Sequence, residues 1–173
     1  MREMLPITPK KSNQLQTITV RLATQEDVPG IFALVNTHAL RGNLLPRPWK
    51  SIDNAIDDWW VAEADSEILG CVSLRGYGSG LMEIRSLAVQ DRLQGLGIGS
   101  RLVNLTMKEA KRRRVPALFA LTRATLFFEK MGFTQLDRDL LVEKSWQDCR
   151  HCPLVDHCDE TAMITHLDEA PAF

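Results

Sequence analysis

Hydrophobic and polar residues follow two different periods along this chain, and their succession predicts a mixed α/β architecture. Alternating or β-branched apolar runs predict strands, whereas apolar residues three and four positions apart predict helices. The expected strands cover 17–23, 59–64, 67–78, 81–89, 117–122 and 162–167, with one more around Thr134. The expected helices cover 27–40, 51–58, 97–113 and 123–133. This order favours a partly antiparallel sheet over a doubly wound one.

Local signals mark where several of these elements begin and end. Thr24 and Asp27 have the spacing of a capping box in front of the first helix. The apolar positions of that helix are Val28, Ile31, Leu34 and Val35. Ser51 is expected to cap the second helix, and residues 64–67 to turn a hairpin between two strands.

The fourth strand, 81–89, changes its alternation part-way. Met82 and Ile84 are apolar at even positions, whereas Leu87 and Val89 are apolar at odd positions. One regular strand cannot bury both pairs on the same face, because a shift of one residue turns every side chain over. A β-bulge near residues 85–86 would reconcile them, and a strand that is covered on both faces is the alternative.

Composition narrows the classes of protein to consider. A length of 173 residues suits one domain with its own core, and a net charge of −1 gives no general attraction to nucleic acid or membrane surfaces. No apolar run approaches the ~20 residues of a membrane helix. Residues 1–16 lack the apolar region of a secretory signal. This segment is polar, and we expect it to be a disordered tail. We therefore expect a cytoplasmic protein with reduced thiols.

A glycine-rich turn follows the fourth strand and opens a helix. Gly95, Gly97 and Gly99 leave the backbone bare where free N–H groups and the helix dipole attract an anion. A Walker A loop would need Lys before Ser100, and a dinucleotide fold would need a different glycine spacing and a later acidic residue. The pattern that remains is Gln94-x-x-Gly97-x-Gly99.

That pattern resembles the pyrophosphate loop of the GNAT superfamily of acetyl-CoA-dependent acetyltransferases. EIRSLAV (83–89) resembles the fourth strand of that family with its bulge, and FFEKMGF (127–133) resembles its last helix and the turn that follows. With HALRGNLLPR (38–47) and LFALT (118–122), the chain resembles more narrowly the acetyltransferase domain of N-acetylglutamate synthases.

The resemblance implies a single-domain GNAT fold over residues 17–168, α/β of the α+β type. Its mixed, mostly antiparallel sheet is splayed at the fourth strand and has helices on both faces. It also implies transfer of an acetyl group from acetyl-CoA to an amino acid, foremost L-glutamate, as in arginine biosynthesis. Two features depart from the family. The chain has no room for the amino-acid-kinase domain of long members, and a cysteine-rich insert at 148–160 lies outside the pattern.

Alternative functions are an acetyltransferase for another small amine and a non-catalytic acyl-CoA-binding regulator with a metal-bearing tail. The partner implied in every case is a small molecule, not a nucleic acid or a membrane. We also consider a homodimer.

For the cofactor, the resemblance implies pantetheine bound by the backbone of the fourth strand and pyrophosphate bound by the glycine turn. The residues concerned are Leu87, Ala88 and Val89 in the strand and Gln94, Gly95, Leu96, Gly97, Ile98, Gly99 and Ser100 in the turn. Glu83 matches the general base of the family, and a structural ion pair with a neighbouring Arg is the alternative. Many relatives carry a Tyr as general acid where this chain has Phe128, and its only tyrosine is Tyr77.

A dicarboxylate substrate needs forked cationic donors. The resemblance places Arg47 near the substrate, with Arg85 and Arg123 as further candidates and Lys144 after them. Each could instead be a solvated surface cation.

Three cysteines near the C-terminus have a spacing that suits a metal. Cys149, Cys152 and Cys158, with His157, would complete a tetrahedral zinc site. Free thiols and an iron–sulfur or redox role are the alternatives, while Cys71 is expected in the core.

Overall fold

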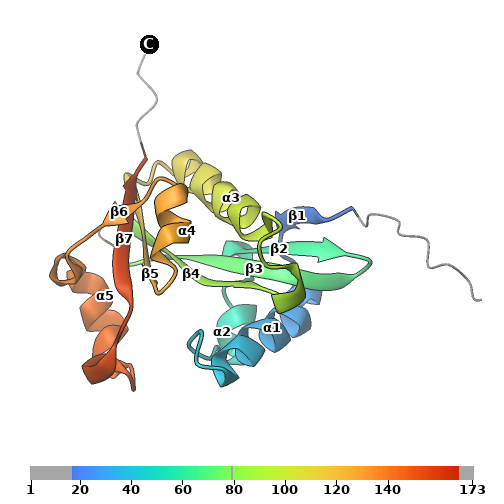
Figure 1. Ribbon diagram of the computed structural model, residues 1–173, viewed down its shortest axis with the longest axis horizontal. Coiled ribbons are helices and arrows are strands. Elements are labelled where there is room, and N and C mark those ends of the chain that lie inside the picture. The colour runs from blue at the N-terminus through green and yellow to red at the C-terminus, as the bar shows by residue number, and fades with distance from the viewer. Residues whose placement is uncertain (1–16, 79, 168–173) are drawn as a thin grey trace, which may run out of the picture.

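A seven-stranded mixed sheet forms the centre of the computed structural model, which describes residues 17–78 and 80–167 (Figure 1). The strand order is β1-β2-β3-β4-β5-β7-β6, and every neighbouring pair is antiparallel except β4 and β5. The predicted fold class is confirmed. The tail predicted at 1–16 lies outside the described residues. Within the described ranges, no helix is long and apolar enough to cross a membrane.

The elements follow the order that the periodicity predicts, except that helix α5 was not predicted. The strands are β1 (Thr19–Leu22), β2 (Trp59–Ala64), β3 (Glu67–Gly76), β4 (Leu81–Val89), β5 (Ala117–Thr122), β6 (Thr134–Gln135) and β7 (Thr161–His166). The α-helices are α1 (Val28–Leu40), α2 (Trp49–Asp53), α3 (Ile98–Arg112), α4 (Thr125–Lys130) and α5 (Val142–Gln147). Short 3₁₀ turns lie at Gln25–Asp27, Ile56–Asp58, Asp91–Leu93, Arg138–Leu140, Cys149–His151 and Val155–His157.

Three of the predicted element ends can be compared directly with the structure. The capping box before α1 is formed, since the Thr24 N–H donates to Asp27 Oδ2 at 2.8 Å. The cap predicted at Ser51 is wrong. Helix α2 starts at Trp49 with the extended Pro48 as its N-cap, so Ser51 lies inside the helix and cannot cap it. Asp58, which was predicted to end this helix, belongs to a separate 3₁₀ turn.

Both faces of the sheet are covered by helices (Figure 1). On one face, α1 and α2 bury Val28, Ile31, Val35 and Ile52 against the sheet. On the other face, α3 and α4 bury Ile98, Leu102, Val103 and Phe128. Cys71 lies in the first of these cores as predicted, and burial raises the pKa of its thiol to about 12, which keeps it protonated and unreactive.

Strand β4 bends at the place where its alternation changes. Ser86 has a φ of +53°, and the register with β3 jumps from Ser73↔Arg85 to Cys71↔Ala88. Two residues of β4 therefore oppose one residue of β3, which is the predicted β-bulge.

The bulge follows the point at which β4 leaves β5. Their register pairs run only from Leu81↔Ala117 to Glu83↔Phe119, whereas β5 stays paired with β7 as far as Thr122. The predicted splay of the sheet at the fourth strand is confirmed, and it places Glu83 where the two strands separate.

Candidate active site

The glycine turn after β4 presents bare backbone at the start of α3. Gly95 and Gly97 have φ values of +79° and +84°, and a Cβ built on either would meet no atom within 4 Å. Glycine is therefore required here for its left-handed backbone rather than for space. Gly97 is the N-cap of α3, and no described side chain caps the free N–H groups of its first turn. These groups and the helix dipole form a site for an anion.

The other residues of the turn divide into two roles. Leu96 is 67% exposed, whereas the side chain of Ile98 is buried and anchors the helix to the sheet. Gln94 Nε2 lies 3.3 Å from the carbonyl of Val89 and donates to it, which ties the turn back to β4. Ser100 is half-buried in the first turn of α3, and a Cβ at Gly99 would lie 3.6 Å from the ring of Phe127.

Beyond Glu83, and so throughout the bulge and the end of the strand, β4 has no register partner on β5. Ala88 is buried against the core under α1, while Leu87 and Val89 pack against the core under α3. The Val89 carbonyl lies 3.1 Å from His38 Nε2 in addition to its bond from Gln94. Ala88 pairs with Cys71 of β3, whereas Leu87 has no register partner on either neighbouring strand, so its backbone is the better placed to bind another molecule.

A group of charged side chains surrounds Glu83. We call it the charged cluster, and its members are Arg47, Arg75, Tyr77, Glu83, Arg85, Lys144 and Asp148. They come from five places in the fold, namely the loop between α1 and α2, strand β3, the residue just beyond it, strand β4, and α5 with the residue that follows it.

Glu83 is only 4% exposed and is held by two donors. Its Oε2 atom accepts from Lys144 Nζ at 2.9 Å, and it shares the single proton of the Tyr77 hydroxyl, 2.5 Å away, with Asp148 Oδ2, which lies 2.6 Å from that hydroxyl. The ion pair predicted as an alternative therefore exists, but its cation is Lys144 and not an arginine. Lys144 also donates to Asp148 Oδ2 at 2.9 Å.

Burial and charge set the protonation of the neighbours of Glu83. Burial, followed by the charge of Glu83, raises the pKa of Tyr77 far above its usual range, so this phenol stays protonated. Burial acts to raise the pKa of Asp148, but hydrogen bonds from Tyr77 and Lys144 outweigh it and hold that pKa at about 2. Asp148 is therefore a carboxylate at neutral pH.

The arginines of the charged cluster are held less completely. Arg47 donates from Nε to Ser86 Oγ at 3.0 Å. Arg75 and Arg85 each approach Asp148, at 3.6 and 3.5 Å, and the buried Nε of each lacks a partner among the described residues. Burial lowers the pKa of Arg47, and the nearby charge of Arg85 lowers it further. These cations repel one another and would be stabilised by an added anion.

The charged cluster carries more positive than negative charge. Arg47, Arg75, Arg85 and Lys144 are four cations, and Glu83 and Asp148 are two carboxylates, which leaves an excess of two positive charges. An excess of this kind at a partly buried place attracts an anionic ligand.

A groove lies in another part of the molecule and has a different character. It has a volume of about 1040 Å³ and runs along α1 and the turn between β2 and β3. Its charged residues pair with each other, such as Arg21 with Asp27 and Arg41 with Asp91. Because these charges are already compensated, the charged cluster beside the separation of β4 and β5 is the better candidate for chemistry.

Comparison with known proteins decides the family. Residues 55–135 match the acetyltransferase (GNAT) domain. The chain is 34% identical over 148 residues to an uncharacterized N-acetyltransferase of Chlorobaculum tepidum. That match covers 86% of this chain and 96% of the relative. It is 36% identical over 121 residues to an amino-acid acetyltransferase of Mycobacterium tuberculosis, or 68% of this chain and 69% of the relative. The chain belongs to the GNAT family of N-acetyltransferases.

Solved structures of similar GNAT proteins contain CoA. The N-acetylglutamate synthase of Neisseria gonorrhoeae, complexed with CoA and N-acetyl-glutamate, superposes with a TM-score of 0.79 at 27% identity. That match covers 88% of this chain but only 35% of the Neisseria chain. A Mycobacterium tuberculosis protein in complex with CoA and NLQ superposes with a TM-score of 0.75 at 29% identity, over 87% and 99% of the two chains. This GNAT enzyme is thus related to amino-acid acetyltransferases.

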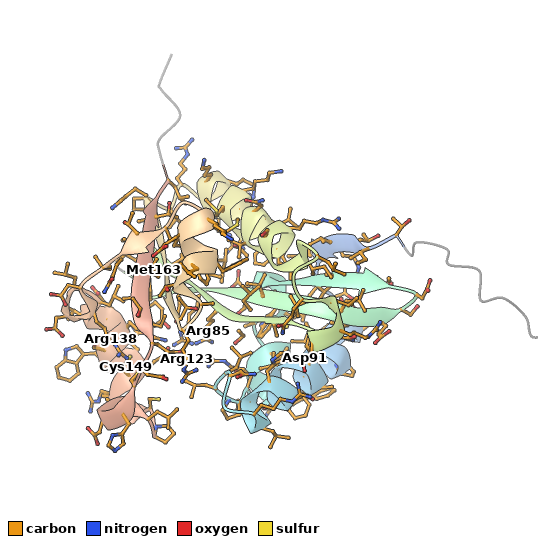
Figure 2. All side chains as sticks on the ribbon, viewed as in Figure 1. Arg85, Asp91, Arg123, Arg138, Cys149 and Met163 are labelled. Atoms are coloured by element: carbon orange, nitrogen blue, oxygen red, sulfur yellow. The ribbon has the colours of Figure 1, made fainter. Side chains whose placement is uncertain are left out.

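Three of the four predicted substrate candidates lie in the charged cluster of the GNAT enzyme, and one does not. Arg47, Arg85 and Lys144 are members, whereas Arg123 pairs with Asp159 at 2.7 Å. Arg123 also donates to the carbonyl of Gly42 at 3.4 Å and so fastens the loop that carries Arg47. Figure 2 shows Arg85 and Arg123 on the side of the sheet that carries α1, α2 and α5.

The predicted zinc site is not formed. Within the described ranges, no three His, Cys, Asp or Glu side chains converge as metal ligands. Cys158 instead accepts a hydrogen bond from Arg138 at 2.9 Å, and a guanidinium repels a metal ion. Cys149, Cys152 and Cys158 are free thiols, and His157 ends a short 3₁₀ turn. Figure 2 places Arg138 close to Cys149 in the C-terminal segment.

Sequence reasoning missed the role of this segment in the site. Tyr77, Asp148 and Arg75 were not predicted as site residues, and Lys144 was considered only for the substrate. For Lys144 and Asp148, the signal in the sequence is their i,i+4 spacing in a stretch with no amphipathic pattern.

Proposed function

We propose that this enzyme transfers the acetyl group of acetyl-CoA to the α-amino group of a dicarboxylic amino acid, with L-glutamate as the best fit. The observation that supports it is the excess of two positive charges in the charged cluster. A glutamate carries two carboxylates, one for each of the two excess positive charges. N-Acetyl-glutamate is present in the similar Neisseria structure, and the reaction would belong to amino-acid biosynthesis.

In this proposal the glycine turn and β4 hold acetyl-CoA. The pyrophosphate would lie on the N–H groups at Gly97, Ile98 and Gly99, and the pantetheine along the backbone of Leu87 and Ala88. A backbone N–H beside the thioester oxygen would stabilise the negative charge of the tetrahedral intermediate. Residues 17–168 then act as one acetyltransferase domain.

Glu83 would act as the general base on the acceptor. Its carboxylate takes a proton from the substrate ammonium, through water or directly, and the free amine attacks the thioester carbon. The carbon–sulfur bond then breaks and CoA leaves as a thiolate. Phe128 is buried in the core and has no proton to give, so the thiolate takes its proton from the attacking nitrogen or from solvent.

Arg47 and Arg85 would hold the carboxylates of the acceptor. Each guanidinium offers a planar fork of donors that matches a carboxylate with two hydrogen bonds. Arg47 uses a single side-chain bond within the described structure, to Ser86, and Arg85 has a buried Nε without a partner there. Both therefore keep donors for a ligand.

Replacing Gly97 with alanine should weaken acetyl-CoA binding by ~5- to 30-fold. A φ of +84° costs a residue with a Cβ ~1–2 kcal/mol, and relaxing that strain rotates the N–H groups out of the anion site. Isothermal titration calorimetry measures the affinity. Gly132→Ala is the matched control, because Gly132 has a φ of +89° and equally open surroundings at the end of α4. Equal losses of affinity in both variants would mean that strain alone, and not the turn, explains the effect.

Turnover with a panel of amino acids tests the proposed acceptor. CoA release is measured with L-glutamate, L-aspartate, L-glutamine and L-lysine, and mass spectrometry identifies the acetylated product. We expect the highest kcat/KM with glutamate, and a value ~10-fold or more lower with glutamine, because glutamine lacks one charge-assisted contact worth ~1.5–3 kcal/mol. A preference for lysine or for an amine without a carboxylate would overturn the proposal in favour of another small-amine acetyltransferase.

A further inference from the structure

Helix α5 turns its polar side inward. This helix of six residues buries Lys144, which is 8% exposed, while Val142 and Trp146 are 53% and 65% exposed. Lysine is almost never fully buried unless it is paired, since removing its charge from water is costly. A specific interaction must therefore compensate for this burial.

That interaction satisfies every donor of the Lys144 ammonium. Its Nζ lies 2.9 Å from Glu83 Oε2, 2.9 Å from Asp148 Oδ2 and 3.1 Å from the Tyr77 hydroxyl. An ammonium has three donors and all three are used, so Lys144 is a fixed point charge beside Glu83. Asp148, four residues further on, keeps the ammonium in place.

Both donors to Glu83 bind the same oxygen. Tyr77 and Lys144 contact Oε2, and in the described part of the chain no donor lies on Oε1. Oε1 is therefore the oxygen that can take up a proton, while Oε2 is held in place.

Other charged or titratable groups face Glu83 from several elements. They are Arg47, Arg75, Tyr77, Arg85, Asp148, Cys149 and Glu160. Of the cations around Glu83, Lys144 is the one in direct contact with it in the described structure.

We propose that Lys144 is a positioning residue that keeps Glu83 ionised and oriented for proton abstraction, so that α5 completes the active site. This inference rests on the proposed role of Glu83 as base. A buried carboxylate without a counter-charge takes up a proton and can no longer act as a base near neutral pH. In each turnover Glu83 gains the substrate proton and then releases it to water.

The proposal extends the active site beyond the segment that defines the family match. The GNAT domain match ends at residue 135, and Lys144 and Asp148 follow it. The segment between α4 and β7 therefore has a task in the reaction rather than only in covering the sheet.

The pH dependence of kcat/KM tests this role in the full-length enzyme. The substrates are acetyl-CoA and L-glutamate, or the best acceptor found in the panel. Lys144→Met should lower kcat/KM at pH 7 by ~10- to 100-fold and move the acidic limb of the profile upward by about one pH unit or more. The loss should shrink at high pH. Lys144→Arg should recover part of the activity and keep the acidic limb near its original place. Ser145→Met, which adds the same side chain at the exposed neighbouring position, should match the wild type.

Three outcomes would overturn the inference. The first is a loss of kcat/KM in Lys144→Met that is equal at every pH. The second is an upward shift of the acidic limb in Lys144→Arg as large as that in Lys144→Met. The third is a loss of kcat/KM in the Glu83→Gln, Lys144→Met double variant that equals the product of the two single losses. If Lys144→Met does not fold, Lys144→Gln replaces it in the same series. If Glu83→Gln alone stays active, the base role in the proposed function fails instead.

Discussion

Replacing Glu83 with glutamine should lower kcat by ~10²- to 10⁴-fold and leave the Kd for acetyl-CoA within about twofold. Glutamine has the same shape and its amide oxygen can still accept from Tyr77 and Lys144, so the packing around this buried side chain survives. It cannot take a proton from the substrate ammonium. Stopped-flow or steady-state CoA release measures kcat, and calorimetry measures Kd.

The pH profile separates the two roles that Glu83 could have. In the wild type kcat/KM should rise with pH as the base and the substrate amine lose their protons, and Glu83→Gln should lose the part that belongs to the base. Glu26→Gln, at an exposed position, is the matched control and should behave like the wild type. A Glu83→Gln enzyme with normal activity and an unchanged profile would reduce Glu83 to a structural partner of Lys144.

Replacing Arg47 with alanine should raise the KM for glutamate by ~10- to 100-fold. A charge-assisted bond between a guanidinium and a carboxylate contributes ~1.5–3 kcal/mol, and Arg47 leaves donors free beyond its bond to Ser86. Arg47→Lys keeps the charge but loses the fork, so it should recover only part of the loss. Arg150→Ala removes an exposed arginine and serves as the control.

Comparison of two acceptors shows which carboxylate Arg47 holds. A larger loss with glutamate than with glutamine would assign Arg47 to the side-chain carboxylate. Equal losses would assign it to the α-carboxylate and would weaken the case for glutamate. Unchanged kinetics with both acceptors would remove Arg47 from the site.

The sequence predicts the glycine turn and the bulge of β4 well because local patterns determine them. The change of parity between Ile84 and Leu87 predicts the bulge, and the bulge is found at Ser86. The backbone at Gly95 and Gly97 has a positive φ that favours glycine, so the glycines in the sequence are enough to predict the turn. Glu83 and the strand end are predicted from the same short segment.

The acceptor side could be predicted only in part, because its contacts join distant residues. Tyr77 and Lys144 are 67 positions apart and Glu83 and Lys144 are 61, and no local pattern links them. Helix α5 was missed since its apolar residues face outward and its lysine faces inward, the reverse of the amphipathic rule. The zinc prediction finds no support among the described residues. The spacing of the cysteines is compatible with a metal, but Arg138 contacts the thiol of Cys158.

A crystal structure with CoA and L-glutamate tests the central claim most directly. We predict the CoA pyrophosphate at the start of α3 and the glutamate carboxylates within hydrogen-bond distance of Arg47 and Arg85. The amino nitrogen should then lie between Glu83 and the CoA sulfur, where β4 and β5 separate. Glutamate bound away from the charged cluster, or with its amino group pointing away from Glu83, would contradict it.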